Sequence, residues 1–268
     1  MNQIAPEQLA QMLGVPLFNT PYFIPVYPSG DQGSWRLSHM ASGIDFGYYT
    51  RQWLISGMPL LMRHAPGNPE QWETWMSLTP HEIESQEPGC LCAHGHTVIM
   101  GLGMGWVALN AALNPAVRKV TVVELDEEVI KLISASGVTG QLPPEIADKI
   151  VIVRANAMEW QPDEPVDFLY ADIWRPIADT NALADTQRMQ QNIQATEVYF
   201  WGQELRLFTA HQRMFGPDAP LGVEGLRHCA SRELSLPLVL PWGDEYPERI
   251  TAAVTNRQVR GLPMEERA

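Results

Sequence analysis

The feature that most constrains the fold is a short apolar run followed at once by three alternating glycines and a helical pattern. Residues 97–100 form the run, and Gly101, Gly103 and Gly105 follow it. Residues 106–113 then have the pattern of a short helix, which Asn-Pro ends. Glycines let the chain turn sharply and let backbone amides approach a ligand closely. This order predicts a βα unit whose connecting loop binds a nucleotide.

Further units of the same kind follow along the chain. Residues 119–124 predict a second strand, and Asp126 can cap the helix after it, which Gly137 suits as an end. The spacing predicts an α/β domain of Rossmann-like type, a doubly wound and mostly parallel sheet. The remaining predicted elements are strands at 150–154, 166–172, 196–201, 234–240 and 250–255, and helices at 185–195 and 203–213.

The first 80 residues have a different character. They are rich in proline and aromatic side chains and lack the alternation of strands and helices found later. We therefore expect residues 1–80 to be an irregular extension or cap on the substrate side, and residues 81–268 to be the nucleotide-binding domain. Such an extension can serve as a lid or as the contact of a homodimer.

The net charge and the cysteine content indicate which partners and which cellular compartment to expect. The chain has 18 basic and 31 acidic residues, so its net charge of -13 opposes nucleic acid. The uncharged stretch 97–117 is long enough to span a membrane, but its glycines, asparagines and proline favour a strand, turn and helix instead. Three cysteines leave one unpaired under any disulfide scheme, and the N-terminus has no signal-peptide pattern. We expect a cytoplasmic protein with a small-molecule substrate, and neither nucleic acid nor membrane as partner.

One segment invites a metal interpretation. Cys90, Cys92, His94 and His96 offer four soft ligands. Their alternate spacing differs from the usual gap of structural zinc sites, and the segment runs directly into the first strand. We therefore expect no metal here.

Polar residues at the ends of the predicted strands are the candidates for chemistry. Glu124 ends the second strand, where a carboxylate can accept hydrogen bonds from both ribose hydroxyls of a nucleoside. Asn156 and Ala157 follow the third strand and can neighbour an adenine edge. Trp106 stands where a dinucleotide-binding loop needs a small residue, which argues against NAD.

Asp172 is the first candidate for catalysis. It ends the fourth strand, where open α/β sheets place their reacting ligands. A carboxylate there can orient an amine nucleophile, accept its proton, or offset the positive charge of a sulfonium. Trp174, two residues further, can cover a cofactor or face a cation.

Taken together, the segments 98–105, 122–126 and 167–172 resemble the class I S-adenosylmethionine (SAM)-dependent methyltransferases, and more narrowly their spermidine synthase-like branch. The resemblance covers about residues 80 to 202. It implies SAM as cofactor, Glu124 as the ribose ligand and Asn156-Ala157 beside the adenine. It also places Asp172 on the catalytic aspartate, and Glu82 in an element that precedes the sheet on the substrate side.

Three departures from the branch matter. Met104 replaces an aspartate that holds the amine of decarboxylated SAM, Pro80 replaces a tyrosine, and Arg175 replaces an acid that faces the polyamine. Because an arginine repels a diamine and suits a carboxylate, we expect full SAM and methyl transfer to a small, carboxylate-bearing metabolite. Two alternatives stay open: transfer of an aminopropyl or aminocarboxypropyl group, and a non-catalytic SAM-binding protein.

Overall fold

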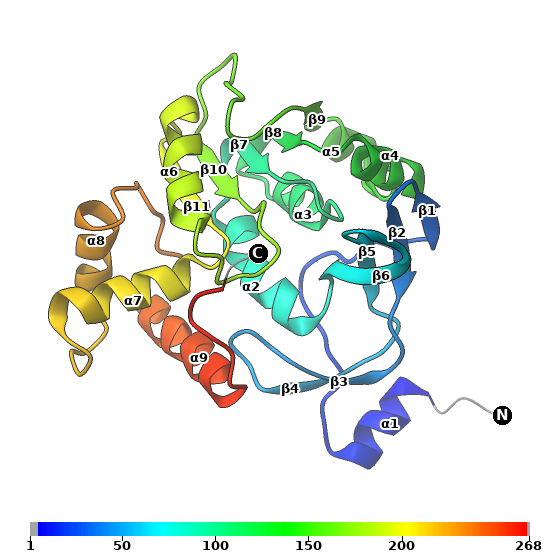
Figure 1. Ribbon diagram of the computed structural model, residues 1–268, viewed down its shortest axis with the longest axis horizontal. Coiled ribbons are helices and arrows are strands. Elements are labelled where there is room, and N and C mark those ends of the chain that lie inside the picture. Colours follow the sequence, from blue (N-terminus) through cyan, green and yellow to red (C-terminus); the bar gives the residue numbers. More distant parts are fainter. Residues whose placement is uncertain (1–4, 267–268) are drawn as a thin grey trace.

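The centre of the molecule is a five-stranded parallel sheet. The computed structural model describes residues 5–266. The sheet has the order β11-β10-β7-β8-β9, so the chain starts in the middle, builds outward to one edge, and then returns to build the other (Figure 1). This order is that of a doubly wound Rossmann-like domain and confirms the predicted fold class. Its strands are β7 (Gly95–Met100), β8 (Val117–Glu124), β9 (Ile150–Arg154), β10 (Phe168–Ala171) and β11 (Glu197–Phe200).

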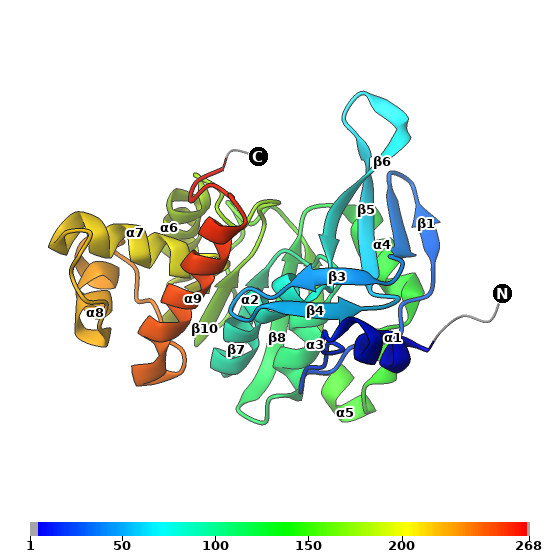
Figure 2. The same ribbon diagram turned by 90° about the horizontal axis from the view of Figure 1, so that it is seen from below.

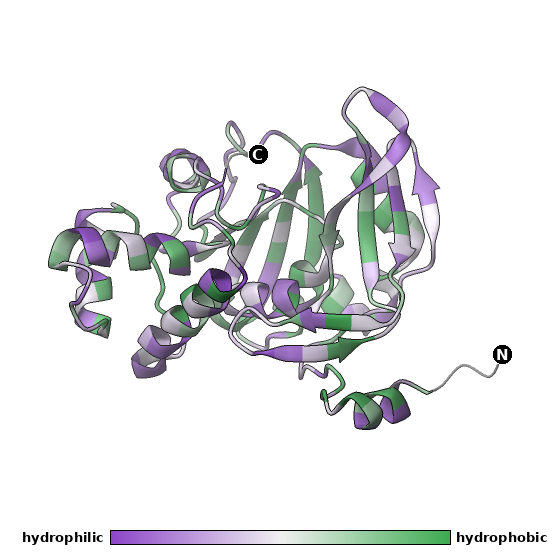
Figure 3. Cartoon of the chain, turned by 60° about the horizontal axis from the view of Figure 1, so that its bottom comes forward, coloured by the Kyte–Doolittle hydropathy of each residue, from purple (hydrophilic) through white to green (hydrophobic). Residues whose placement is uncertain are grey.

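Helices bury both faces of this sheet. In β7, Ile99 packs into the core on one face, while Val98 and Met100 pack into the core on the other. The strands are therefore apolar on both sides, as parallel strands between helices must be, and Figure 3 shows them as largely hydrophobic. The helices that follow the strands are α3 (Trp106–Leu113), α4 (Glu127–Ser136), the short α5 (Pro144–Ala147), α6 (Ala182–Ile193) and α7 (Gln203–Phe215).

The predicted helix boundaries rest on identifiable caps. The side chain of Asp126 accepts a hydrogen bond from the amide of Glu128 at 2.9 Å and so begins α4. Gly137 ends the same helix in the left-handed conformation, with φ of 70°. The helix predicted at 185–195 begins three residues earlier, at Ala182.

The N-terminal segment is not irregular, and this part of the prediction is wrong. After α1 (Pro6–Leu13) it forms a four-stranded antiparallel sheet, in the order β1-β2-β5-β6, and a separate β3-β4 hairpin (Figure 2). Prolines concentrate before this sheet, whereas in β2 and β5 buried residues alternate with less buried ones. Its strands are β1 (Gly30–Gln32), β2 (Trp35–His39), β3 (Gly43–Phe46), β4 (Gln52–Ile55), β5 (Pro59–Ala65) and β6 (Asn68–Ser77).

The N-terminal sheet and the central sheet share one hydrophobic core. Leu37 and Leu61 of the N-terminal sheet belong to the same buried cluster as Ile99 of the central sheet. The boundary proposed after residue 80 falls in the first turn of α2 (Pro80–Cys92), the helix that leads into β7.

The end of the chain is helical where strands were expected. The strand predicted at 250–255 is wrong, because α9 (Tyr246–Val259) covers it and buries Ile250, Ala253 and Val254 at helical spacing. Residues 234–240 form no strand, and only Leu238 bridges to Val198 of β11. A further helix, α8 (Val223–Arg232), was not predicted.

Within residues 5–266 no helix is long and apolar enough to cross a membrane.

Candidate functional site

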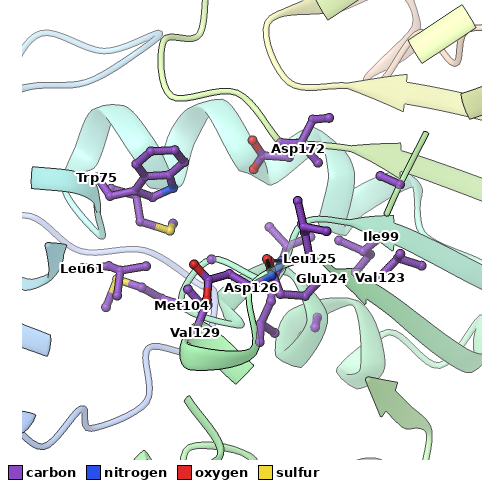
Figure 4. Close-up of a pocket in the computed structure, with 18 of the residues that line it drawn as sticks. Leu61, Trp75, Ile99, Met104, Val123, Glu124, Leu125, Asp126, Val129 and Asp172 are labelled. Carbon is purple, nitrogen blue, oxygen red and sulfur yellow. Dashed lines mark hydrogen bonds between the residues drawn. The ribbon is translucent and has the colours of Figure 1, made fainter. Parts of the chain in front are cut away.

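The main cavity lies at the carboxyl ends of β7, β8 and β10 and is closed over by the N-terminal sheet. Its volume is about 670 Å³, in the range of pockets that hold small organic ligands. Figure 4 shows Asp172 and Glu124 on opposite sides of the cavity, with Trp75 and Leu61 of the N-terminal sheet forming one wall. All but one of the site residues proposed from the sequence line the cavity, and Gly105 is the exception. The lining residues are Glu82, Gly101, Gly103, Glu124, Asn156, Ala157, Asp172, Trp174 and Arg175.

Gly105 stands just outside the lining and opens α3. Its φ of 78° is left-handed, as are those of Gly101 and Gly103. A Cβ at Gly101 would collide with the carbonyl oxygen of Asp172, and one at Gly103 would collide with the sulfur of Met76. The loop therefore needs glycine both for its turns and for the close approach of β10 and β6.

Glu124 is fixed by the backbone at the end of β8. Its Oε2 accepts a hydrogen bond from the Leu102 amide and its Oε1 one from the Asp126 amide, each at 2.8 Å. Because each carboxylate oxygen can accept more than one hydrogen bond, the side chain keeps acceptor capacity toward the cavity. The arrangement suits the binding of a pair of hydroxyl groups.

Asn156 and Ala157 lie in the loop after β9. The Asn156 Oδ1 accepts a hydrogen bond from the Met158 amide at 3.0 Å, which orients the side chain. Its amide nitrogen donates to no described residue. This nitrogen can therefore serve a ligand.

The acidic centre of the cavity consists of Asp172 and Glu82, joined by Gln86. The Gln86 Nε2 donates to Glu82 Oε1 at 3.0 Å and to Asp172 Oδ2 at 3.3 Å. The hydroxyl of Tyr170 donates to the same Asp172 oxygen at 3.3 Å. Removal from water raises the pKa of Asp172 to about 7, against the lowering effect of Tyr170. Burial and the neighbouring Asp172 carboxylate raise the pKa of Glu82 well above its usual value.

Two polar atoms of the cavity wall are buried without a partner in the described chain. One is Gln86 Oε1, a hydrogen-bond acceptor, and the other is Trp106 Nε1, a donor. Such atoms cost free energy unless something binds them. Both atoms have almost no accessible surface, so a ligand could satisfy them only if the neighbouring side chains moved.

Trp174 and Arg175 line the cavity but are also held by protein partners. The Trp174 indole donates to Asp185 Oδ2 at 2.9 Å. The Arg175 Nη1 pairs with Glu73 Oε2 at 3.0 Å, and its Nη2 donates to the carbonyl of Thr74 at 3.1 Å. Arg175 is thus tied to β6, so its charge is largely balanced before any ligand binds.

We expected the N-terminal segment on the substrate side, but sequence reasoning named none of its residues as part of the site. Those that line the cavity are Trp35, Leu61, Arg63, Trp75 and Met76. Sequence reasoning also missed Gln86 and Tyr170. The alternation of apolar and polar residues in residues 35–39 was the available signal for a strand. Nothing in the sequence indicates that this strand lies over the glycine loop.

The cysteine and histidine segment contributes nothing to the cavity. Cys90 is buried in α2, and both ring nitrogens of His96 have partners, the Pro165 carbonyl and the Thr121 hydroxyl. Among residues 5–266 no group of three or more possible metal ligands converges.

Comparison with known proteins finds likeness only at the level of solved structures. No protein-family model and no curated protein sequence matches the chain. A glycopeptide N-methyltransferase complexed with SAM is 15% identical, with a TM-score of 0.32, over 41% of this chain and 43% of that one. A putative RNA methyltransferase from Pyrococcus horikoshii is 19% identical, with a TM-score of 0.35, over 48% and 62%. The CcbJ methyltransferase from Streptomyces caelestis is 17% identical, with a TM-score of 0.32, over 42% and 43%.

In each case the matched part is less than two thirds of the other protein's length. The fold assignment therefore stands on the strand order of the central sheet.

Proposed function

We propose that this protein is a SAM-dependent transferase, a methyltransferase acting on a small metabolite, of the spermidine synthase-like kind. One observation carries the proposal. The Glu124 carboxylate at the end of β8 and the Asp172 carboxylate after β10 face one cavity beside the glycine loop. The first suits a ribose and the second a reacting group, and both lie at the end of the sheet where doubly wound folds bind ligands.

The residues present fit SAM. Glu124 would accept hydrogen bonds from the ribose hydroxyls, and the amide nitrogen of Asn156, with Ala157, would border the adenine. Gly101 and Gly103 would border the methionine part. When bound, SAM supplies an electrophilic methyl carbon on a positively charged sulfonium. The structures likened to this chain include a methyltransferase that holds SAM, which agrees with the choice of cofactor.

The chain's own contribution to catalysis is to hold the acceptor and take its proton. The acidic side chains of Glu82 and Asp172 in the cavity wall favour an acceptor with N–H or O–H donors. With a pKa of about 7, Asp172 is partly ionised at neutral pH and can accept a proton from the nucleophile. Gln86 and Tyr170 keep its carboxylate oriented during that step.

A second candidate is aminopropyl or aminocarboxypropyl transfer on the same fold. The paired acids Glu82 and Asp172 favour it, because a carboxylate of this pair suits a cationic amine. Met104, which is fully buried beside the loop, opposes it because a thioether gives no charge to hold the amine of decarboxylated SAM. The third candidate function is that of a non-catalytic protein that keeps the nucleoside pocket.

The first experiment is calorimetric titration with SAM, decarboxylated SAM and NAD. We expect preference for SAM, and binding weakened about tenfold or more in Glu124→Ala, the loss expected for hydrogen bonds to a charged group. Glu159→Ala, which removes an exposed acid outside the cavity, is the matched control. Binding to none of the three compounds would refute the proposal.

Product mass then separates the first two functions. After incubation with SAM and a panel of small amines and amino acids, a gain of one methyl group supports methyl transfer. A gain of an aminopropyl or aminocarboxypropyl group supports the second candidate. Unchanged SAM after long incubation, with binding intact, supports a non-catalytic role.

A further inference from the structure

We propose that Trp35, Arg63 and Trp75 of the N-terminal sheet form a carboxylate-binding subsite in the main cavity. The inference rests on the proposed function, because it concerns the ligands of that same cavity. It assigns the carboxylate recognition expected of Arg175 chiefly to Arg63, a residue of β5 that was not among the predicted site residues.

The strand register places two of the three side chains, Trp35 and Arg63, on the same face of the sheet. Trp35 of β2 is paired with Arg63 of β5, and Arg63 is paired with Glu73 of β6. Residues directly opposite one another in antiparallel strands project from the same face of the sheet. That face lines the cavity, as the presence of both Trp35 and Arg63 in its wall indicates.

Two indole rings hold the guanidinium. The Arg63 Cζ lies 5.3 Å from the centroid of the Trp35 ring and 5.7 Å from that of Trp75, and the two rings pack edge to face with centroids 5.3 Å apart. Cation–π contact restricts the side chain but leaves its N–H groups without acceptors. Within residues 5–266, Arg63 makes no hydrogen bond or ion pair through its side chain.

The other two arginines of the cavity wall already have carboxylate partners, although Glu127, the partner of Arg154, also binds Lys131. Arg154 pairs with Glu127 at 2.8 Å, and Arg175 pairs with Glu73 at 3.0 Å. Glu73 is the residue paired with Arg63 in the sheet, yet its carboxylate binds Arg175. Glu73 therefore pairs with Arg175 and leaves Arg63 without an ion-pair partner among the described residues.

The acids on the nearby part of the cavity are engaged elsewhere. Asp126 accepts from the Trp35 indole at 2.8 Å through one oxygen and from the Glu128 amide through the other. Glu128 accepts from the Ser34 amide at 2.9 Å, and both oxygens of Glu124 accept backbone amides. Glu82 and Asp172 are bound to Gln86. None of these acids pairs with Arg63, so the N–H groups of Arg63 remain for the carboxylate of a ligand.

A guanidinium matches a carboxylate with two parallel hydrogen bonds, which a neutral group cannot supply. The carboxylate can come from the methionine part of SAM or from the acceptor. Both sources have the same chemistry, and they predict different responses when Arg63 is replaced.

The test compares ligands that differ only in this group. In the first arm, SAM and decarboxylated SAM are titrated into the wild type, Arg63→Gln and Arg63→Lys. In the second arm, 4-aminobutanoate and its amide are titrated into the same proteins saturated with sinefungin. Arg36→Gln is the matched control, because Arg36 follows Trp35 in β2, lies outside the cavity wall and pairs with Asp31.

We expect the wild type to prefer the carboxylate compound in one arm. We also expect Arg63→Gln to reduce that preference about tenfold or more, as for a lost charge-assisted hydrogen bond, with partial recovery in Arg63→Lys. Loss of preference in the first arm assigns the carboxylate to SAM, and loss in the second assigns it to the acceptor. If the wild type binds SAM but Arg63→Gln alters neither preference, the subsite is refuted. If the wild type binds no nucleoside, the proposed function is refuted as well.

Discussion

Glu82 in α2 and Asp172 after β10 share one hydrogen-bond donor, the Gln86 Nε2, at 3.0 Å and 3.3 Å. The two acids are 90 positions apart in the chain, and only the packing of α2 against the sheet brings them together. Two carboxylates that share a donor in a poorly solvated place resist ionising together. At neutral pH the pair therefore keeps at least one proton, and it can exchange that proton with a bound acceptor.

Replacing Asp172 with asparagine keeps the shape of the side chain but removes its ability to accept a proton. We expect kcat to fall by about a hundredfold or more, the usual contribution of general-base catalysis, while the Kd for SAM changes little. Stopped assays and calorimetry would measure the two quantities. Asp163→Asn, which alters an exposed acid of the β9–β10 loop, is the control. Activity within about tenfold of the wild type would contradict the catalytic role of Asp172.

The pH dependence of kcat should follow the ionisation of Asp172. Since the carboxylate is the active form and its pKa is raised to about 7, the rate should rise with pH and level off above that value. Tyr170 donates to the ionised form and so lowers this pKa. Tyr170→Phe should therefore move the profile to higher pH. A profile that is flat between pH 6 and 8, or that moves to lower pH in the variant, would contradict the assignment.

A second buried acid, Glu204 of α7, should make the protein less stable at high pH. Its carboxylate accepts hydrogen bonds from Tyr48, Tyr199 and Tyr246, yet burial raises its pKa to about 7. Because the folded-state pKa lies above the unfolded one, the proton binds the folded state more tightly. The free energy of unfolding should fall by about 3 kcal/mol as the pH rises from about 4 past 7.

Urea unfolding at pH 5 and pH 8 would measure this effect. Glu204→Gln carries no charge at either pH, so we expect the difference in stability between the two pH values to shrink. An unchanged difference would show that Glu204 does not titrate in this range. Glu145→Gln, an acid in α5 far from the tyrosine cluster in sequence, serves as the control.

Replacement of Gly101 by alanine should destabilise the folded protein. Its φ of 97° is unfavourable for a residue with a side chain, and a Cβ there would collide with the carbonyl oxygen of Asp172. We expect Gly101→Ala to lower the free energy of unfolding by about 2 kcal/mol or more and to displace the catalytic carboxylate. Gly140→Ala is the matched control, because no atom lies near its Cβ position and its φ is not positive. Equal thermal stability of the two variants would contradict the proposed strain.

Local sequence was enough to identify the sheet, the glycine loop and the strand-end residues Glu124 and Asp172. Each βα unit carries its own signals, namely an apolar run, a cap such as Asp126 and a glycine at the turn. The carboxyl ends of parallel strands meet at one edge, so the site could be located before its geometry was known. The same local reasoning failed at 250–255, where the apolar residues that suggested a strand belong to the buried side of α9.

Only the tertiary structure shows which residues of other elements lie against that edge of the sheet. The register of β2, β5 and β6 places Trp35 and Arg63 on the cavity wall, and the packing of α2 brings Gln86 between Glu82 and Asp172. These contacts join residues that are far apart in the chain. They are stabilised by the burial of apolar surface between elements, and a local sequence pattern does not show which elements pack together. The sequence by itself determined the type of fold and the edge of the sheet at which the cavity lies. Long-range packing determined which charged side chains are paired in the cavity wall. It therefore also determined that the Arg63 guanidinium remains for a ligand.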